Sequence, residues 1–182
     1  MMDNKEKDPK RKYPRIKNYD YSNVGAYFIT VCTSQRRNYF WQSVVGASIA
    51  RPQHPRKNFS IVGACTARPQ NPCDIKLSEY GKIVDNAINN IEKIYSNVTV
   101  DNYVIMPDHI HLILIIHADE YGRAMHAPTV MRVIQQMKGY ITKQIGLPIW
   151  QKSFFDHIIR NREDYEKHVK YIYENPLRFV YQ

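Results

Sequence analysis

Residues 98–116 constrain the fold most strongly, because two strand-like segments lie there with almost nothing between them. Val98 to Met106 is rich in β-branched residues and predicts one strand. Pro107-Asp108 follows, and the apolar segment from His109 to Ile116 predicts a second strand. Strands joined by so short a connection pair antiparallel, because a parallel arrangement needs a long crossover. We therefore predict an antiparallel strand pair in this region.

The second strand opens with His109-Ile110-His111. Side chains alternate along a strand, so the two imidazoles point to one face while Ile110 and Leu112 point to the other. Neutral imidazole is a common ligand of divalent metals. The alternative is a pair of hydrogen-bonded histidines that binds nothing. Because the two histidines share one face, we favour half of a metal site.

The composition fits one globular domain with a polyanionic partner. The chain has 182 residues, of which 43% are hydrophobic and 14 are tyrosines, enough for one packed core. Its formal charge is 26 − 17 = +9 and its sequence pI is ≈ 9.4. Nucleic acid is the commonest partner of so basic a protein.

Cysteine usage and the lack of a long apolar run predict a cytoplasmic protein. The 3 cysteines form no CxxC pair, which argues against a disulfide framework or a zinc ribbon and fits a reducing compartment. Residues 1–17 are polar and basic, unlike a secretory signal. No apolar run in the sequence approaches the roughly 20 residues of a membrane span. We therefore expect no membrane partner.

Two segments differ in character from a packed core. Residues 1–22 predict a flexible basic arm, in which lysines and arginines alternate with tyrosines; it is either a solvated tail or a clamp on a nucleic-acid backbone. Residues 23–182 predict a single domain. Residues 43–74 interrupt it with a proline-rich stretch in which 45–53 recur as 62–70. This stretch lacks the periodicity of a core element and predicts a mobile insertion.

The other predicted elements complete an α+β chain. Ala26 to Thr33, with its β-branched and aromatic residues, predicts a strand, and Phe154 to Ile159 predicts a short one. Ser78 and Thr129 predict the N-caps of two amphipathic helices. A last helix is expected over 162–174, stopped by Asn175-Pro176. The order of elements predicts a ferredoxin-like sandwich, an antiparallel sheet with helices packed on one face.

The helix that follows Thr129 carries a candidate nucleophile. Tyr140 and Gln144 are four residues apart and share one helix face. If this helix packs near the histidine pair, Gln144 becomes a third metal ligand and Tyr140 lies beside the metal. A phenol is a weak nucleophile while it keeps its proton, and a metal that polarises the phosphate under attack makes it useful. The alternative for Tyr140 is an ordinary core or surface tyrosine.

Four blocks of the sequence resemble one known family. They are residues 103–111, 137–140, 150–160 and 171–176, and in this order they resemble the single-tyrosine transposases of the HUH superfamily. The most similar branch is the REP-associated tyrosine transposases. The resemblance extends over about residues 13–42 and 75–180.

The resemblance implies a ferredoxin-like enzyme that cuts single-stranded DNA at hairpins with Mg²⁺ or Mn²⁺ and leaves a 5′-phosphotyrosine and a free 3′-OH. It implies His109 and His111 as metal ligands, Tyr140 as the nucleophile, and Gln144 as the third ligand, with Asp156 or His157 as alternatives. It also implies a monomer or homodimer in a prokaryotic cytoplasm, associated with the nucleoid. The residues that we expect to contact DNA phosphates are Arg36, Arg37, Lys138, Lys143, Lys152 and Arg160.

Two other readings stay open. A replication-initiator or relaxase-type nickase shares the histidine pair and the tyrosine, although its tyrosine is normally placed differently. A non-catalytic nucleic-acid-binding protein on a ferredoxin-like sheet, including an inactive or domesticated transposase, would bind hairpins without cutting them. A covalent protein–DNA adduct separates these readings.

Overall fold

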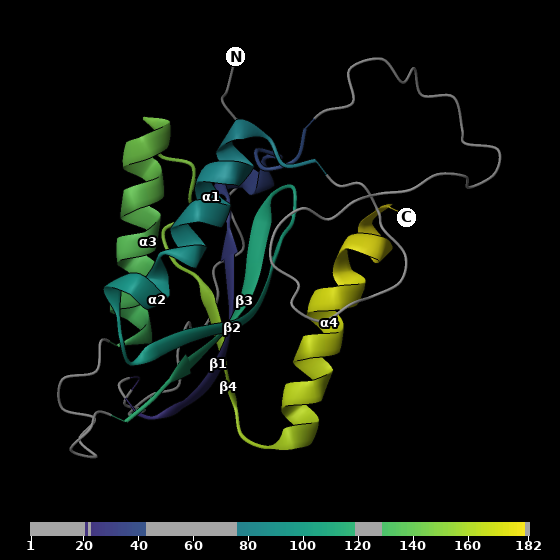
Figure 1. Cartoon of the computed structure of the whole chain (residues 1–182). Coiled ribbons are helices and arrows are strands. Elements are labelled where there is room, and N and C mark those ends of the chain that lie inside the picture. Colours follow the sequence, from purple (N-terminus) through teal and green to yellow (C-terminus); the bar gives the residue numbers. More distant parts are fainter. Residues whose placement is uncertain (1–20, 22, 43–75, 119–128, 181–182) are drawn as a thin grey trace, which may run out of the picture.

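A computed structural model of the chain describes residue 21 and residues 23–42, 76–118 and 129–180. Its four strands are β1 (Gly25–Cys32), β2 (Val98–Ile105), β3 (His109–Ile116) and β4 (Phe155–Ile159). They form one antiparallel sheet in the order β2-β3-β1-β4. This sheet, together with the helices that cover it, confirms the predicted α+β class (Figure 1).

The predicted strand pair is the hairpin of β2 and β3. Ile105 pairs with Ile110 beside the turn, and the amide of Met106 donates to the carbonyl of His109 at 2.8 Å. The register shifts between Val100 and Asn102, where a bulge interrupts the ladder. On its other side β3 pairs with β1, so the histidine strand lies in the middle of the sheet.

The helices begin where the capping residues predict. They are α1 (Glu79–Asn89), α2 (Ile91–Ile94), α3 (Val130–Ile145) and α4 (Arg162–Val180), with a short 3₁₀ turn η1 (Ser34–Arg36) after β1. The hydroxyl of Ser78 accepts from the amide of Gly81, and that of Thr129 accepts from the amide of Arg132. Gly146 ends α3 with φ 77°, a left-handed conformation that suits glycine.

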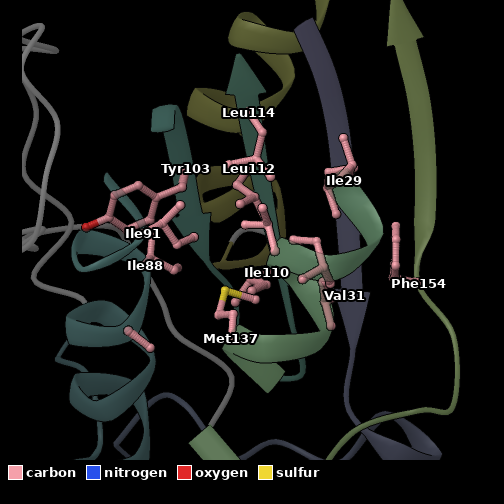
Figure 2. Close-up of a cluster of buried hydrophobic side chains, with 14 of the residues drawn as sticks. Ile29, Val31, Ile88, Ile91, Tyr103, Ile110, Leu112, Leu114, Met137 and Phe154 are labelled. Carbon is pink, nitrogen blue, oxygen red and sulfur yellow. The ribbon is translucent and has the colours of Figure 1, made fainter. Parts of the chain in front are cut away.

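The main core lies between the sheet and the helices α1 and α3. Apolar residues of alternating strand positions point to this side, and Figure 2 shows Val31 and Ile110 close to Met137 of α3. Ile88 and Ile91 approach the same layer from α1 and α2. Ile110, Leu112 and Leu114 are all fully buried. Alternation therefore fixes this face of β3 as the core face.

Helix α4 lies on the opposite face of the sheet from α1 and α3 (Figure 1). Its side chains meet β1 and β3 from that side, where Phe28 contacts Tyr171. The prediction that helices pack on one face describes α1 and α3, whereas α4 covers the other. The His109 and His111 side chains point to the α4 side, because they alternate with the core residue Ile110.

The last helix is longer than predicted. It continues past Asn175-Pro176 to Val180, with Pro176 inside it. Proline has no amide hydrogen for the carbonyl of Ile172, so local sequence predicts a stop. Packing overrides this preference, because the ring of Phe179 in the final turn contacts the ring of Trp41 at a centroid distance of 5.3 Å.

The two predicted irregular segments lie mostly outside the described residues. Of the arm over 1–22, the structure describes Tyr21, which is buried and donates its hydroxyl to Asp156 at 2.7 Å. The predicted insertion over 43–74 lies outside the described residues. Among the helices that are described, each is too short or too polar to cross a membrane.

Candidate active site

The two histidines of β3 are arranged as a chelating pair. Their side chains are buried, and the Nε2 atoms of His109 and His111 are 3.0 Å apart. Two nitrogen ligands at about 2.1 Å from one cation and at a right angle to each other are themselves about 3.0 Å apart. The pair therefore has the spacing of two neighbouring ligands of a divalent metal.

Hydrogen bonds orient both rings from behind. The Nδ1 atom of His109 lies 2.5 Å from a carboxylate oxygen of Asp108, and the Nδ1 atom of His111 lies 2.8 Å from the hydroxyl of Thr30. An ionised carboxylate only accepts, so Nδ1 of His109 carries the proton and its Nε2 keeps a lone pair. Such partners on the far nitrogen are typical of metal-binding histidines.

The protonation states suit metal binding. Burial lowers the pKa of His111 to about 3, and electrostatic interactions with His109 and Arg36 act in the same direction. The imidazole of His111 is therefore neutral at physiological pH. Burial acts to raise the pKa of Asp108, but the hydrogen bond from His109 and the electrostatic interactions with His109 and Arg36 outweigh it, and the pKa is lowered. Asp108 is therefore a carboxylate.

Arg36 completes this support. Its Nε atom lies 2.8 Å from the second carboxylate oxygen of Asp108, and its Nη1 donates to the sulfur of Cys32 at 2.9 Å. Gln35 and Arg36 have φ values of 55° and 52°, a left-handed conformation that is unfavourable for residues with a side chain. The turn after β1 thus holds a strained backbone that directs Arg36 at Asp108. Arg36, which was predicted to contact a DNA phosphate, therefore contacts Asp108 and Cys32 within the protein.

The structure does not bring Tyr140 and Gln144 to the histidine pair. Helix α3 packs on the core face of the sheet, the face of Ile110, whereas the histidines point to the other face. Tyr140 is 47% exposed and lines a groove between α2 and α3 with Ile91 and Tyr95. Gln144 is exposed on the same helix. Tyr140 and Gln144 share one face of α3, but α3 lies on the side of the sheet opposite the histidine side chains.

Helix α4 instead brings Tyr171 to the histidine pair. The ring centroid of Tyr171 lies 5.1 Å from that of His111, edge to face. Phe28 of β1 stacks on His111 at 5.3 Å and contacts Tyr171 at 6.0 Å. Tyr171 is 40% exposed, so its hydroxyl is available to a ligand. Sequence analysis missed this tyrosine as a site residue, although it begins the block 171–176.

A cavity of ≈ 470 Å³ opens between the sheet and α4. His111, Thr30 and Phe28 line it from the sheet, and α4 contributes Tyr171. Its remaining lining residues are polar or charged residues of α4, namely Lys167, His168, Lys170, Glu174 and Arg178. The cavity therefore combines His111 of the chelating pair, Tyr171 and three cationic side chains that the predicted set of DNA contacts did not include.

Asn175 follows Tyr171 by one helical turn. Positions i and i+4 lie on one face of a helix, so the amide of Asn175 points to the same side as Tyr171. Its Nδ2 atom is buried and has no hydrogen-bond partner within the described part of the chain. This pair has the spacing that Tyr140 and Gln144 were chosen for. The sequence shows this four-residue spacing between Tyr171 and Asn175, and Tyr171 follows His168 by three residues.

The two alternative third ligands lie elsewhere. Asp156 pairs with the core residue Ile29 and accepts the hydroxyl of Tyr21, so its carboxylate points away from the histidine pair. His157 points to the α4 side, where its Nε2 lies 2.8 Å from a carboxylate oxygen of Asp164. The structure therefore separates Asp156 from the site and engages His157 with another partner.

The predicted DNA contacts differ in exposure. Arg37, Lys143, Lys152 and Arg160 are exposed. Arg37 donates to Gln35 at 2.7 Å, and the backbone amide of Arg160 lies 3.3 Å from Asp164. Lys138 is half-buried, donates to the carbonyl of Gln151 at 2.7 Å, and has its pKa lowered by burial. Lys138 thus makes a structural contact within the protein, and the phosphate contacts of all these residues stay predictions.

Comparisons with known proteins agree with the fold and the motifs. No protein-family model matches the chain. It is 25% identical to an uncharacterised Haemophilus influenzae protein, over 92% of this chain and 88% of that one. It is 33% identical to a REP-associated tyrosine transposase of Escherichia coli, over 43% of this chain and 44% of that one. The alignment with this transposase thus spans less than half of either chain.

The fold resembles that of a solved relative. The structure of a REP-associated tyrosine transposase bound to a REP hairpin matches with a TM-score of 0.55 and 21% identity, covering 95% of this chain and 74% of that chain. At this identity the match establishes the fold. Together with the sequence matches, it confirms the resemblance to REP-associated tyrosine transposases that the motifs predict.

Proposed function

We propose that this protein is a metal-dependent enzyme that cuts and rejoins single-stranded DNA beside hairpins through a phosphotyrosine intermediate, with Tyr171 as the nucleophile. The observation that carries the proposal is the position of Tyr171, whose ring lies 5.1 Å from His111 across one cavity. The resemblance to REP-associated tyrosine transposases supports the reaction class, and the relative bound to a REP hairpin supports the kind of DNA.

His109 and His111 would hold the divalent metal, Mg²⁺ or Mn²⁺, because their Nε2 atoms have the spacing of adjacent ligands. Asn175 is the candidate third ligand through its Oδ1 oxygen, since it shares a helix face with Tyr171. Imidazole ligands favour Mn²⁺ over Mg²⁺. The metal would act as a Lewis acid that stabilises the negative charge developing on the phosphate.

Tyr171 would attack the phosphorus atom through its hydroxyl oxygen. A bond forms between the phenol oxygen and phosphorus as the phenol loses its proton, and the bond from phosphorus to the 3′ oxygen breaks. The 3′ oxygen takes up a proton to become a 3′-OH, so one proton is lost and one is gained. The energy of the broken ester is kept in the phosphotyrosine ester. A 3′-OH can therefore reverse the step, which allows joining without an external energy source.

The α4 side of the cavity would hold the DNA backbone. Lys167, Lys170 and Arg178 line it and lie on the helix that carries Tyr171. Their charges would neutralise phosphates and release counterions, which makes binding depend strongly on salt. Phe28 forms the aromatic wall of the cavity on the sheet side, where an unpaired base could stack.

A covalent-adduct assay tests the proposal. The full chain is incubated with Mn²⁺ and a labelled single strand that carries a hairpin, and adducts are separated on a denaturing gel. Wild type is expected to form an adduct, and Tyr171→Phe is expected to abolish it. Tyr140→Phe and Tyr173→Phe are matched controls that keep it. An undiminished adduct with Tyr171→Phe would overturn the assignment, and hairpin binding without any adduct would favour the non-catalytic alternative.

A further inference from the structure

A second cluster of metal-ligand side chains lies on the same face of the sheet. It consists of His157 from β4 and of Asp164 and His168 from α4, and one ligand atom from each lies within 4.8 Å of the others. The Nε2 of His157 lies 2.8 Å from Oδ2 of Asp164, and the Nδ1 of His168 lies 3.2 Å from Oδ1. One carboxylate thus faces two imidazoles.

The backbone brings these three side chains together. His157 pairs with Phe28 in the β1–β4 register, so both point to the α4 side. Asp164 and His168 are one helical turn apart and share a face. The first turn of α4 is held by Asn161, whose side-chain oxygen accepts from the amide of Asp164 at 2.8 Å. The rings of His157 and His168 stack at a centroid distance of 4.7 Å.

The cluster is separate from the chelating pair of β3. The two sets share no residue, and Phe28 contacts both, with centroid distances of 5.3 Å to His111 and 4.5 Å to His168. His109 and His111 are buried, whereas the side chain of His157 is 51% exposed and the cluster opens to solvent. A cation could therefore reach this cluster independently of the first site.

We propose that His157, Asp164 and His168 form a second divalent-metal site that ties β4 to α4. Two imidazoles and one carboxylate make a donor set that suits transition metals such as Zn²⁺ better than Mg²⁺ or Ca²⁺, which prefer oxygen ligands. The hydrogen bond from His157 lowers the pKa of Asp164, so the carboxylate is ionised as a ligand must be. The Nδ1 of His168 also lies 2.8 Å from the carbonyl of Asp164, which can only accept a hydrogen bond. A cation that binds Nδ1 would release its proton to solvent.

The position of this site gives it a structural role. His168 precedes Tyr171 by three residues, and β4 is an edge strand of the sheet. A cation held by His157 and His168 would fix the first half of α4 against that edge and so orient the helix that carries Tyr171. The site does not require that the protein cut DNA, so it stands or fails separately from the proposed function.

Zinc titration of the full chain, followed by isothermal calorimetry, tests this proposal. His157→Ala and His168→Ala are each expected to bind one equivalent of Zn²⁺ fewer than wild type. Circular dichroism checks that the variants are folded. His117→Ala is the matched control, because His117 is exposed and its ring nitrogen hydrogen-bonds to Thr99, away from the cluster. It should retain the wild-type stoichiometry.

The remaining outcomes separate the two sites. His109→Ala should remove a different equivalent and leave the one that depends on His157. In a Co²⁺-loaded protein, the visible absorption of the second site should disappear in Asp164→Asn and persist in His109→Ala. If His157→Ala and His168→Ala bind Zn²⁺ with wild-type stoichiometry and affinity, or if wild type binds none, the second site does not exist.

Discussion

Single side chains behind the histidines set up the candidate metal site. Asp108 and Thr30 occupy the far nitrogens of the two rings, and Arg36 holds the second oxygen of Asp108. The contacts of Thr30 and Arg36 are not evident from residue spacing, because Thr30 lies 111 − 30 = 81 residues before His111 and Arg36 lies 108 − 36 = 72 residues before Asp108. The pair itself was predictable, since strand alternation places both imidazoles on one face whatever the surrounding fold.

Asp108→Asn is expected to weaken Mn²⁺ binding. An amide accepts a hydrogen bond more weakly than a carboxylate and loses the ion pair with Arg36, so the ring of His109 is oriented less firmly. Changes to such supporting partners typically reduce metal affinity about 10–100-fold. Calorimetric titration with Mn²⁺ measures the effect, and Arg37→Ala serves as the control because Arg37 is exposed and contacts Gln35 instead. Unchanged affinity in Asp108→Asn would show that Asp108 does not support the site.

Tyr165 is expected to make stability fall at high pH. Its hydroxyl donates to Asp101 at 2.6 Å, and this hydrogen bond, with burial, raises the pKa of Tyr165 to about 12. A raised pKa means that the protonated phenol favours the folded state. That stability is present below the unfolded pKa of about 10 and is lost as the pH rises through about 12. Urea unfolding at pH 9 and pH 11 should show a larger loss for wild type than for Tyr165→Phe, and equal losses would contradict the assignment.

At the scale of elements, local signals predicted helix and strand boundaries well. The caps at Ser78 and Thr129 depend on hydrogen bonds within a few residues, and both were predicted correctly. The predicted end of α4 was wrong, because the helix is extended by the contact of Phe179 with Trp41. These residues are 179 − 41 = 138 positions apart, so local sequence does not indicate the contact. Sequence periodicity shows which side of a helix is buried, but not which face of the sheet it covers. For this reason periodicity alone does not show that Tyr171 of α4, and not Tyr140 of α3, lies beside the histidine pair.

Ile110→Ala is expected to destabilise the protein by about 2–5 kcal/mol, because it leaves a cavity between β3 and α3. Ile110 is fully buried, whereas Ile94 is 65% exposed and provides the matched control. Ile94→Ala should change the free energy of unfolding by about 0.5 kcal/mol or less. Urea denaturation followed by circular dichroism measures both. Equal effects would mean that the face of β3 opposite the histidines is not the core face.

For the whole molecule, basic side chains and the candidate metal site lie on the same side of the sheet, the side of α4. The net charge of +9 indicated a nucleic-acid partner but gave no location for it. The structure places Lys167, Lys170 and Arg178 along the cavity beside the histidine pair. A charge count cannot supply that location, because it depends on α4 crossing the face of the sheet opposite α3.

Lys170→Ala is expected to weaken hairpin binding and to flatten its dependence on salt. Each phosphate contact that is lost should reduce the slope of log K against log salt concentration by about 0.7 for single-stranded DNA. Fluorescence anisotropy with a labelled hairpin over a range of NaCl concentrations measures this slope. Lys93→Ala, at an exposed lysine of α2, should change it less, because α2 packs beside α3 on the other face of the sheet. An equal change in both variants would place the DNA elsewhere.

The identity of the covalently modified tyrosine tests the central claim most directly. The adduct formed with a hairpin strand and Mn²⁺ can be digested with nuclease and trypsin and analysed by tandem mass spectrometry. Trypsin releases Tyr171 within residues 171–178 and Tyr140 within residues 139–143, so the two are separated by mass, and fragmentation distinguishes Tyr171 from Tyr173. We predict a 5′-nucleotide on Tyr171. A nucleotide on Tyr140 or on any other tyrosine would contradict the assignment of Tyr171 as the nucleophile.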